Sequence, residues 1–536
     1  MTVIQSKLAL SAETSLRNRD HMLTLVGRLK SFEERTRSES QKAAALFASR
    51  GQMLPRERIS HLLDAGAPWL ELATLAGLGV EESDAHKSAP GAGVIVGVGY
   101  VARVRCMIVA SDAGINAGAI GAMGMEKIAR AQEIALRNKL PFLHLVESAG
   151  ANLMKYKVAT FVQGGCIFRN LVRLSAAGVP VVTIVHGSST AGGAYFPGLS
   201  DYVIMVRGRA RAFLAGPPLL RAATGEIATE EELGGAQMHA SISGLAEYLA
   251  ENDADAIRIA RDVVSRLNWS CDLMPRGSVP RYPADDLLAI MDADGRKSID
   301  MREVIARIVD DSDFLDFKAD FGPATVTGHA SIEGQHVGII TNNGPIDPAG
   351  ASKAAHFIQS CCQVGLPLLY LQNTTGYIVG KASETEGMIK HGSKMIQAVT
   401  TANVPQITLM CGASFGAGNY GMCGRGFEPR FLFSWPNAVT AVMGPQQAAL
   451  TMGIVMEESA RRRGQVLDES KVAEVKSRIM ETFERQMSAF HCSGQLLDDG
   501  VIDPRDSRKA IAFVLSVCIE GDRRTPAPMQ FGVARP

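Results

Sequence analysis

A run of very small side chains, SSTAGGAYFPG at residues 188–198, directly follows the apolar segment VPVVTIVHG at residues 179–187. The apolar segment is short, rich in β-branched residues and closed by glycine, which predicts a β-strand. Backbone N–H groups that follow a strand and lead into a helix can hold a negatively charged oxygen, and a side chain there would obstruct it. Small residues also serve tight turns and close packing. Taken alone, the segment is compatible with either role.

The same pattern occurs a second time, because GVPVVTIVHGSSTAGGAY is matched by NVPQITLMCGASFGAGNY in the second half of the chain. Four landmarks recur in the same order at nearly constant spacing: Leu140 and Leu366, Pro180 and Pro405, Gly193 and Gly418, and Gly216 and Gly444. A repeat of this kind indicates two copies of one domain. Two copies of the glycine-rich turn would make two oxyanion holes.

Each copy alternates helical and strand patterns. The segment EKIARAQEIALRNKL at residues 126–140 has the apolar spacing of a helix and leads at once into the apolar run LPFLHLV. Continuous apolar strands separated by helices predict an α/β fold with both sheet faces covered. The segment NWSCDLMPRGSVPRYPA is rich in proline and polar residues and is typical of a linker. We therefore expect two domains, residues 1–284 and 285–536.

Composition narrows the class of protein. The 536 residues carry 55 basic and 55 acidic side chains, so net charge gives no reason to expect nucleic acid or an anionic membrane as partner. Nine cysteines without a CxxC pair favour a reducing compartment and no metal site. The first twenty residues lack a secretory signal, and no uncharged run reads as a membrane span. We expect a cytoplasmic protein.

Seven segments together resemble a known family, the carboxyltransferase β subunits of biotin-dependent acyl-CoA carboxylases. They are ESAGANL, STAGGAY, LAGPPLL, ELGGAQMH, LQNTTGYIVG, KHGSK and AVMGPQQAA, and the resemblance runs over roughly residues 25–530. It implies two tandem crotonase-like domains. It also implies that the hole in the first half holds the thioester oxygen of acyl-CoA, while the hole in the second half holds the ureido oxygen of biotin.

The resemblance assigns roles to named residues. The N–H groups of Gly192 and Gly193 would serve the acyl oxygen, with Gly150 as a further candidate, and those of Ala417 and Gly418 would serve biotin. Five further residues would border the ligands: Lys127, Ala149 and Gly150 beside coenzyme A, and Phe415 and Gly416 beside biotin. For Lys127 a phosphate contact and a solvated surface charge both remain open. His144, His186 and His391 are expected to be hydrogen-bonded structural residues and not bases.

The reaction that the family performs is consistent with a missing base. The turn Gly192–Ala194 has no Glu or His beside it, and Asp201 is the nearest acid along the chain. A crotonase-type hydratase would need positioned carboxylates, whereas carboxybiotin can release CO2 and accept the substrate proton itself.

Other parts of such an enzyme are absent from the sequence. The chain has no Met-Lys-Met biotinylation motif and no phosphate-binding P-loop. The resemblance therefore implies an α subunit that contains biotin carboxylase and biotin carrier domains and uses ATP and bicarbonate. It also implies assembly of the β subunit, usually as a hexamer within an α6β6 holoenzyme.

The segment TFVQGGCIFRN bears on the substrate. β subunits of 3-methylcrotonyl-CoA carboxylase typically carry a Phe-Gly pair here, and this chain has Gly164 and Gly165. Each glycine costs a helix about 1 kcal/mol relative to alanine, so the pair marks either a helix kink or room for a longer acyl chain. Room favours geranyl-CoA over 3-methylcrotonyl-CoA, propionyl-CoA or another acyl-CoA.

Three rival functions stay open from the sequence. The first is a biotin-dependent decarboxylase subunit, which would share the fold and run the chemistry in reverse. The second is a crotonase-type hydratase or isomerase that works without biotin. The third is a scaffold subunit without activity, although a scaffold would have no need for intact glycines in both turns.

Overall fold

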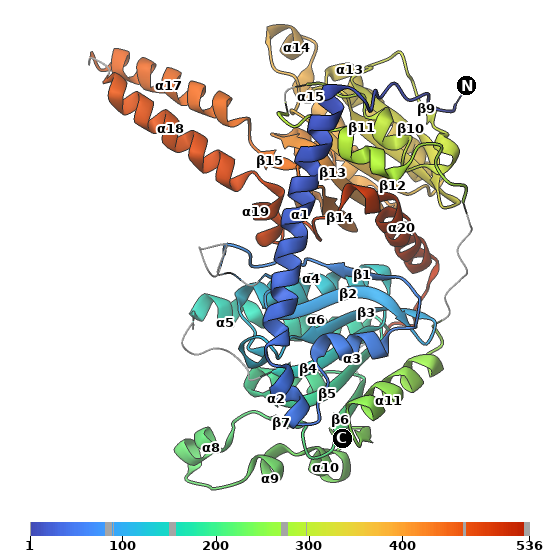
Figure 1. The fold of residues 1–536 in the computed structure, drawn as a ribbon, viewed down its shortest axis with the longest axis vertical. Helices are drawn as coiled ribbons and strands as arrows, with labels where there is room; N and C mark the ends of the chain where they lie inside the picture. Colours follow the sequence, from blue (N-terminus) through green and yellow to red (C-terminus); the bar gives the residue numbers. More distant parts are fainter. Residues whose placement is uncertain are drawn as a thin grey trace. The chain divides into compact units, whose positions relative to one another are not determined.

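The computed structural model describes residues 2–80, 88, 90–148, 157–269, 277–295, 297–464 and 468–529. They form two compact units, coloured along the chain in Figure 1. We call Ser31–Leu273 with Val517–Pro536 the first unit, and Met1–Lys30 with Met274–Ser516 the second unit. The domain boundary expected near residue 285 stays a prediction.

The first unit is built on one mixed sheet. Its strand order is β1-β2-β3-β4-β5-β6-β8, with β7 paired to the far end of β5. β2 pairs antiparallel with β1 and with β3, and from β3 onward the pairs are parallel. The strands are β1 (Trp69–Leu72), β2 (Val94–Val101), β3 (Val104–Ser111), β4 (Phe142–Ser148), β5 (Val181–Thr190), β6 (Tyr202–Val206), β7 (Arg211–Phe213) and β8 (Tyr248–Ala250).

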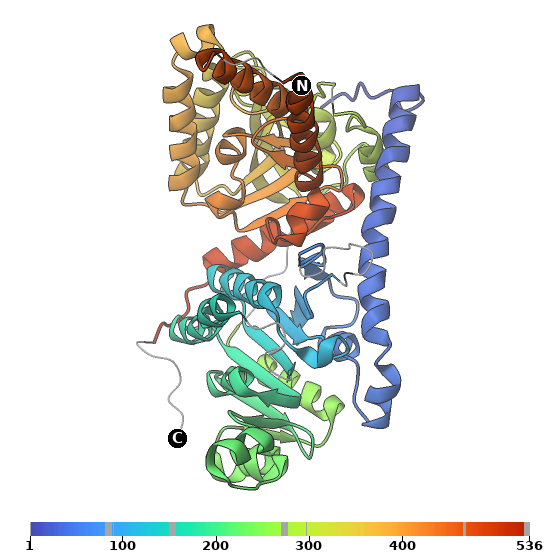
Figure 2. The same ribbon diagram turned by 90° about the vertical axis from the view of Figure 1, so that its left-hand side faces the viewer.

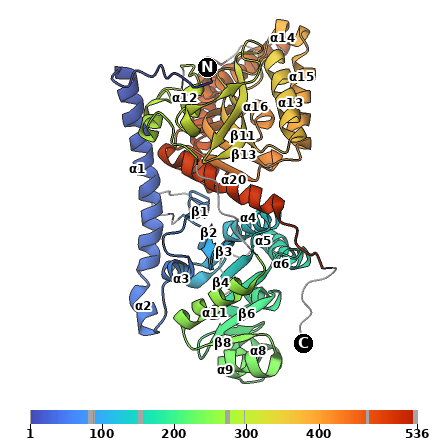
Figure 3. The same cartoon turned by 90° about the vertical axis from the view of Figure 1, so that its right-hand side faces the viewer.

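Helices cover both faces of this sheet. In Figure 3, α4 and α6 lie on one side of the strands, and α3 and α11 lie on the other. The helices of the unit are α2 (Ala44–Ser49), α3 (Pro55–Leu62), α4 (Ala122–Asn138), α5 (Val158–Gly164), α6 (Cys166–Ala176), α7 (Tyr195–Gly198), α8 (Pro217–Thr224), α9 (Glu230–Gly234), α10 (Ala236–Met238) and α11 (Asp253–Arg266).

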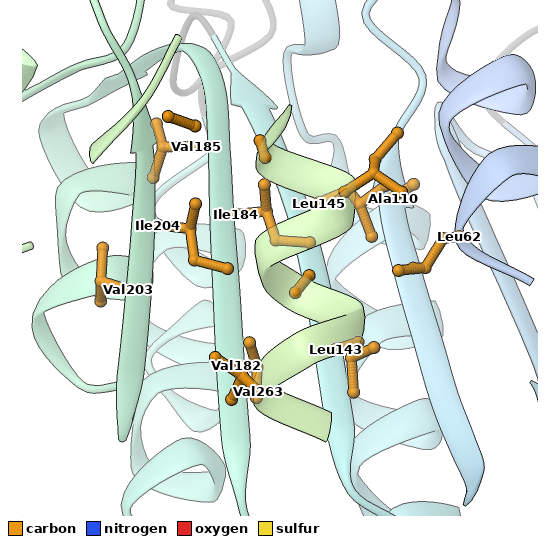
Figure 4. Packing of buried hydrophobic residues seen from close by; sticks show 14 of the residues in the cluster. Leu62, Ala110, Leu143, Leu145, Val182, Ile184, Val185, Val203, Ile204 and Val263 are labelled. Carbon is orange, nitrogen blue, oxygen red and sulfur yellow. The ribbon is translucent and has the colours of Figure 1, made fainter. Parts of the chain in front are cut away.

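The core beneath α11 shows why these strands read as continuous apolar runs. Every residue of β4 is buried, and so are most residues of β5. Figure 4 shows Leu143, Val182, Ile184 and Ile204 packed beneath α11, which contributes Val263. Strands buried on both faces have no polar alternation, so their positions could be predicted from the sequence.

The second unit repeats the topology of the first. Its strand order is β14-β13-β12-β11-β10-β9, with β15 paired to the far end of β13. The hairpin β10–β11 is antiparallel, and β11, β12, β13 and β14 are parallel neighbours. The strands are β9 (Leu315–Asp316), β10 (Thr325–Ile332), β11 (Gln335–Asn342), β12 (Leu368–Thr374), β13 (Gln406–Phe415), β14 (Phe431–Ser434) and β15 (Val439–Ala441). The predicted α/β fold and its internal duplication are confirmed.

The second unit differs from the first in the helices that follow its glycine-rich turn. The hairpin of α17 and α18 projects from the unit (Figure 1), whereas α8, which occupies the matching place in the first unit, is short. The helices are α12 (Arg302–Ile305), α13 (Pro348–Gln363), α14 (Lys381–Thr385), α15 (Met388–Thr401), α16 (Gly418–Gly421), α17 (Pro445–Arg462), α18 (Glu469–Gln486) and α19 (Ala489–Gly494).

Two long helices, α1 (Glu13–Gln41) and α20 (Ser507–Arg523), contain residues of both units. Figure 2 shows α1 as an extended blue helix. None of the helices in the described ranges is both long and apolar enough to cross a lipid bilayer.

Candidate active site

Both units end a buried parallel strand with the same turn. β5 ends at Thr190, and Ala191 then has φ +53°, in the left-handed region. β13 ends at Phe415, and Gly416 has φ +54°. In each case a short helical turn follows, Ala191–Ala194 in the first unit and α16 in the second. The two glycine-rich segments therefore adopt one backbone conformation.

This conformation presents backbone N–H groups that the turn itself does not use. The first N–H groups of a helical turn have no partner within that turn. Gly192 is exposed and Gly193 is buried, and the matching residues Ala417 and Gly418 are exposed and buried in the same order. Either turn can thus hold one oxygen that carries negative charge.

In both units a serine near the end of the strand forms a hydrogen bond with the turn that follows. In the first unit Ser189 Oγ donates to the carbonyl oxygen of Gly193 at 2.8 Å. In the second unit Ser414 occupies the matching position, and its Oγ accepts a hydrogen bond from Asn419 Nδ2 at 2.8 Å. The first bond orients the peptide between Gly193 and Ala194, and the second joins the end of β13 to α16.

The two turns differ in the space around their glycine residues. A Cβ built on Gly193 would meet only Ser189 Oγ, at 3.5 Å, and a Cβ on Gly192 would touch Phe168 Cζ at 3.6 Å. Both are ordinary contacts, so packing of the protein does not require glycine there. A Cβ on Gly418 would lie 2.8 Å from Gly376 Cα, so glycine at 418 is needed for close backbone packing.

A second glycine pair precedes the turns and was not predicted. Gly187 on β5 lies against Glu147 on β4, where an added Cβ would fall 2.6 Å from Oε1. Gly412 on β13 lies against Asn373 on β12, with Oδ1 at 2.5 Å from an added Cβ. The strand register shifts at Glu147 and at Asn373 alike. The only signal in the sequence was that Gly187 and Gly412 align in the repeat.

Glu147 belongs to a buried polar network in the first unit. Arg58 on α3 donates from Nη1 to Glu147 Oε2 at 2.6 Å and from Nε to Asp253 Oδ2 at 3.1 Å. Asp253 at the start of α11 also contacts His186 Nδ1 at 2.9 Å. Gln52 Nε2 donates to Glu147 Oε1 at 3.1 Å. The network therefore ties the ends of β4 and β5 to α3 and α11.

Burial and charge set the protonation of this network. Burial opposes the charge on Asp253, but the hydrogen bond from His186 and the Arg58 guanidinium keep the pKa of Asp253 well below its usual range. Burial, reinforced by Arg58, lowers the pKa of His186, so the imidazole is neutral at physiological pH. His186 Nε2 and Arg58 Nη2 are buried and have no hydrogen-bond partner among the described residues.

The expectation that three histidines are hydrogen-bonded is confirmed for two of them and wrong for the third. His186 is hydrogen-bonded to Asp253, and His391 Nδ1 to Ser352 Oγ at 2.7 Å, as predicted. For His144 the expectation of a hydrogen bond was wrong, because neither ring nitrogen has a partner in the described parts of the chain. Its ring packs edge-on against Phe196 at 4.6 Å between centroids, and burial lowers its pKa to about 3.

Gly164 and Gly165 mark a helix break. α5 ends at Gly164, Gly165 links it to α6, and the break agrees with the kink expected from two glycines. Gly164 is buried, and a Cβ built there would lie 2.5 Å from Met125 Sδ on α4. Phe168 on α6 lies beside Gly192, so α6 leads from the glycine-rich turn back towards Gly164.

Lys127 lies in the first unit but away from the glycine-rich turn. Its ammonium is buried and donates to the carbonyl oxygens of Val94 at 2.7 Å and Gly91 at 3.3 Å. Burial lowers its pKa to about 8. Lys127 lines a cavity that no residue of the 188–198 turn borders. Contact with a coenzyme A phosphate stays a prediction, and Ala149 and Gly150 lie outside the described residues.

Comparison with known proteins identifies a matching family and several similar proteins. The carboxyl transferase domain family matches residues 48–531. A crystal structure of the geranyl-CoA carboxylase β subunit from P. aeruginosa is 49% identical and superposes with a TM-score of 0.93, covering 99% of this chain and 100% of that one. A probable biotin-dependent acyl-coenzyme A carboxylase β2 subunit of Mycobacterium tuberculosis is 47% identical over 91% of both chains.

A eukaryotic relative is similar over nearly the whole chain. The mitochondrial methylcrotonoyl-CoA carboxylase β chain of Dictyostelium discoideum is 42% identical over 98% of this chain and 90% of its own. The similarity therefore spans both units.

The different space around the two turns predicts different responses to the same change. Gly193→Ala should leave the stability of the chain nearly unchanged, because its Cβ meets only an ordinary contact. Gly418→Ala should lower the free energy of unfolding by about 1–3 kcal/mol, as overpacking does. Thermal unfolding of the two full-length variants measures this, and equal losses would contradict the assigned packing.

The buried network predicts a loss of stability in acid. Asp253 has a lowered pKa when folded, so its contribution is complete above about pH 3.9, its unfolded value, and is lost as pH falls towards the folded value. His186 is held neutral, so unfolding takes up a proton below about pH 6.5 and stability declines from there. Urea unfolding at pH 7.5 and pH 5 should show the decline.

Asp253→Asn should cost roughly 3–5 kcal/mol at pH 7.5, because it leaves the buried Arg58 charge with one partner fewer. Asp255→Asn on the same helix is the matched control, since Asp255 pairs with Arg258 on the surface and should cost about 1 kcal/mol or less. Similar losses at both positions would show that the network does not hold the strands.

Proposed function

The chain belongs to the carboxyl transferase family, and on this premise we propose that it is the carboxyltransferase β subunit of a geranyl-CoA carboxylase. The resemblance to β subunits of biotin-dependent acyl-CoA carboxylases is confirmed by relatives that align over both units. What the substrate is, and which residues bind it, are our proposals. The observation that carries the assignment of the binding residues is the repeated turn after β5 and β13.

The two turns suit a reaction with two charged oxygens. In our assignment, Gly192 and Gly193 donate to the thioester oxygen of acyl-CoA, where charge develops when the substrate loses its proton. Ala417 and Gly418 donate to the ureido oxygen of biotin, with Phe415 and Gly416 beside the ring. The exposed positions of Gly192 and Ala417 leave room for both ligands. Carboxybiotin, when bound, would supply CO2, and the biotin that remains would accept the substrate proton.

The polar groups around the first turn support this reaction over hydration. Both oxygens of Glu147 are engaged, one by Arg58 and one by Gln52. Asp201 accepts from Ser175 Oγ and from the Val181 N–H, so it braces the start of β5. His144 has its pKa lowered to about 3 by burial, too low for a general base at neutral pH. None of these three groups is therefore suited to act as the base that a hydratase needs.

The proposed substrate follows from Gly164. Where an aromatic side chain would fill the space beside α4, this chain has only hydrogen, and a Met side chain occupies the gap. A methionine can move aside at little cost, so the pocket can admit a longer acyl chain than 3-methylcrotonyl. The similarity to a geranyl-CoA carboxylase β subunit supports the same choice.

The proposed reaction requires a partner. We assign ATP-dependent carboxylation of biotin to an α subunit that carries biotin carboxylase and biotin carrier domains, because this chain has no biotinylation motif. Hexamer formation within an α6β6 holoenzyme is part of the proposal and rests on the family resemblance. A cytoplasmic location is also part of it and rests on the scattered cysteines, which favour a reducing compartment.

Reconstitution tests the proposed reaction. The chain mixed with its biotinylated α subunit should carboxylate geranyl-CoA in the presence of ATP and bicarbonate. Gly193→Val should abolish transfer without unfolding the chain, since two methyl groups would obstruct the oxyanion position. Hydration of an enoyl-CoA by this chain alone, or full activity of Gly193→Val, would overturn the assignment.

The acyl pocket predicts a change of preference on Gly164→Phe. The phenyl group should lower kcat/KM for geranyl-CoA by about 10-fold or more and leave that for 3-methylcrotonyl-CoA within about 3-fold. Steady-state kinetics with geranyl-CoA, 3-methylcrotonyl-CoA and propionyl-CoA measures it. A preference for a short acyl-CoA that Gly164→Phe does not alter would keep the carboxyltransferase and discard Gly164 as the selector.

A further inference from the structure

A line of four side-chain positions leads away from the candidate oxyanion hole of the first unit. It begins at Gly192, where an added Cβ would lie 3.6 Å from Phe168 Cζ. The Phe168 ring also packs against the rings of Tyr195 and Phe196, at 5.8 and 5.5 Å between centroids. Phe168 therefore borders the turn, and apolar groups surround the place where an acyl chain would leave it.

The line continues along the helices before Phe168. Gly164 is four residues earlier, and Gly165 between α5 and α6 keeps helical dihedrals, φ −57° and ψ −18°. Gly164 is the last residue of α5 and Phe168 lies in the first turn of α6, so only the helix break at Gly165 and the start of α6 separate the two positions.

Met125 ends the line. A Cβ built on Gly164 would lie 2.5 Å from Met125 Sδ and 3.4 Å from its Cε. The thioether therefore occupies the volume that a side chain at position 164 would take. Met125 is half-buried on the first turn of α4. Its unbranched chain with three rotatable bonds can repack around a ligand more easily than any other apolar side chain of its size.

We propose that Met125 is the movable end of the acyl pocket and sets, together with Gly164, the longest acyl chain that the enzyme accepts. The distal apolar part of a branched, isoprenoid-type chain takes the place that the Met125 thioether holds in this structure, and the thioether moves aside. The inference deepens the proposed function and rests on it for the identity of the site.

Substitution at Met125 should change selectivity in opposite directions. The probes are geranyl-CoA and 3-methylcrotonyl-CoA, and the readouts are their dissociation constants with the full-length chain and kcat/KM in the holoenzyme. Met125→Phe should weaken geranyl-CoA binding about 10-fold or more, because a rigid ring cannot move aside, and Met125→Ala should strengthen it severalfold. Neither change should alter 3-methylcrotonyl-CoA binding by more than about 3-fold.

Met123→Ala is the matched control. It removes the same atoms from the same helical turn, but Met123 is buried elsewhere and does not contact Gly164. It should lower stability and leave the ratio of the two dissociation constants unchanged. A ratio that stays within twofold in both Met125 variants, or that changes equally in Met123→Ala, would overturn the inference.

A double-mutant cycle tests the contact independently of activity. Gly164→Phe should lower the Tm because the phenyl group must displace the thioether, and adding Met125→Ala should restore part of the loss. Strictly additive changes in Tm would show that the two positions do not share one volume. Carboxylation by the wild-type holoenzyme reports on the proposed function, whereas the binding ratio and this cycle report on Met125, so the two can fail separately.

Discussion

The left-handed residue at the end of β5 and of β13 is the constraint on which the candidate site depends. An L-residue in this conformation costs roughly 1–2 kcal/mol, and the first unit accepts that cost with Ala191, where the second uses Gly416. Such a conformation persists only where its surroundings hold it. Here β5 is held on both sides by parallel pairing with β4 and β7. The turn that results exposes the N–H groups of the next residues.

The surroundings of the two turns have diverged although their backbones match. Beneath the first turn the glycine of β5 contacts Glu147, a carboxylate held by a buried guanidinium. Beneath the second, the glycine of β13 contacts Asn373, a neutral amide that accepts from the Ala413 N–H at 3.3 Å. The second turn is also packed against Gly376, whereas the first has open space before Gly193. In our assignment the same turn conformation thus binds two different ligands.

Much of the architecture was predictable from local patterns. Strands such as LPFLHLV are buried on both faces and therefore read as apolar runs, and the repeat spacing showed that the two halves share one topology. The position of both glycine-rich turns followed from the same spacing. Alanine rarely adopts a left-handed conformation, so the φ of Ala191 could be suspected only from its alignment with Gly416.

Contacts between distant segments were not predictable. Arg58 joins Glu147 and Asp253 across 89 and 195 residues, and nothing local in the sequence pairs them. The same holds for Met125 beside Gly164, because the packing of α4 on α5 decides it. For Lys127 the resemblance implied a phosphate contact, which stays a prediction, and the alternative of a solvated surface charge is wrong because the ammonium lies buried against two carbonyl oxygens.

The central claim is that the N–H groups at Gly192 and Gly193 hold the thioester oxygen. Isotope-edited infrared spectroscopy of geranyl-CoA labelled with ¹³C at the thioester carbonyl tests this most directly, because hydrogen bonds to the oxygen weaken the C=O bond. The account predicts a carbonyl band at lower frequency in the complex than in free geranyl-CoA, and its return to the free position in Gly193→Val with the ligand still bound. A band at the free position in the wild-type complex would contradict it.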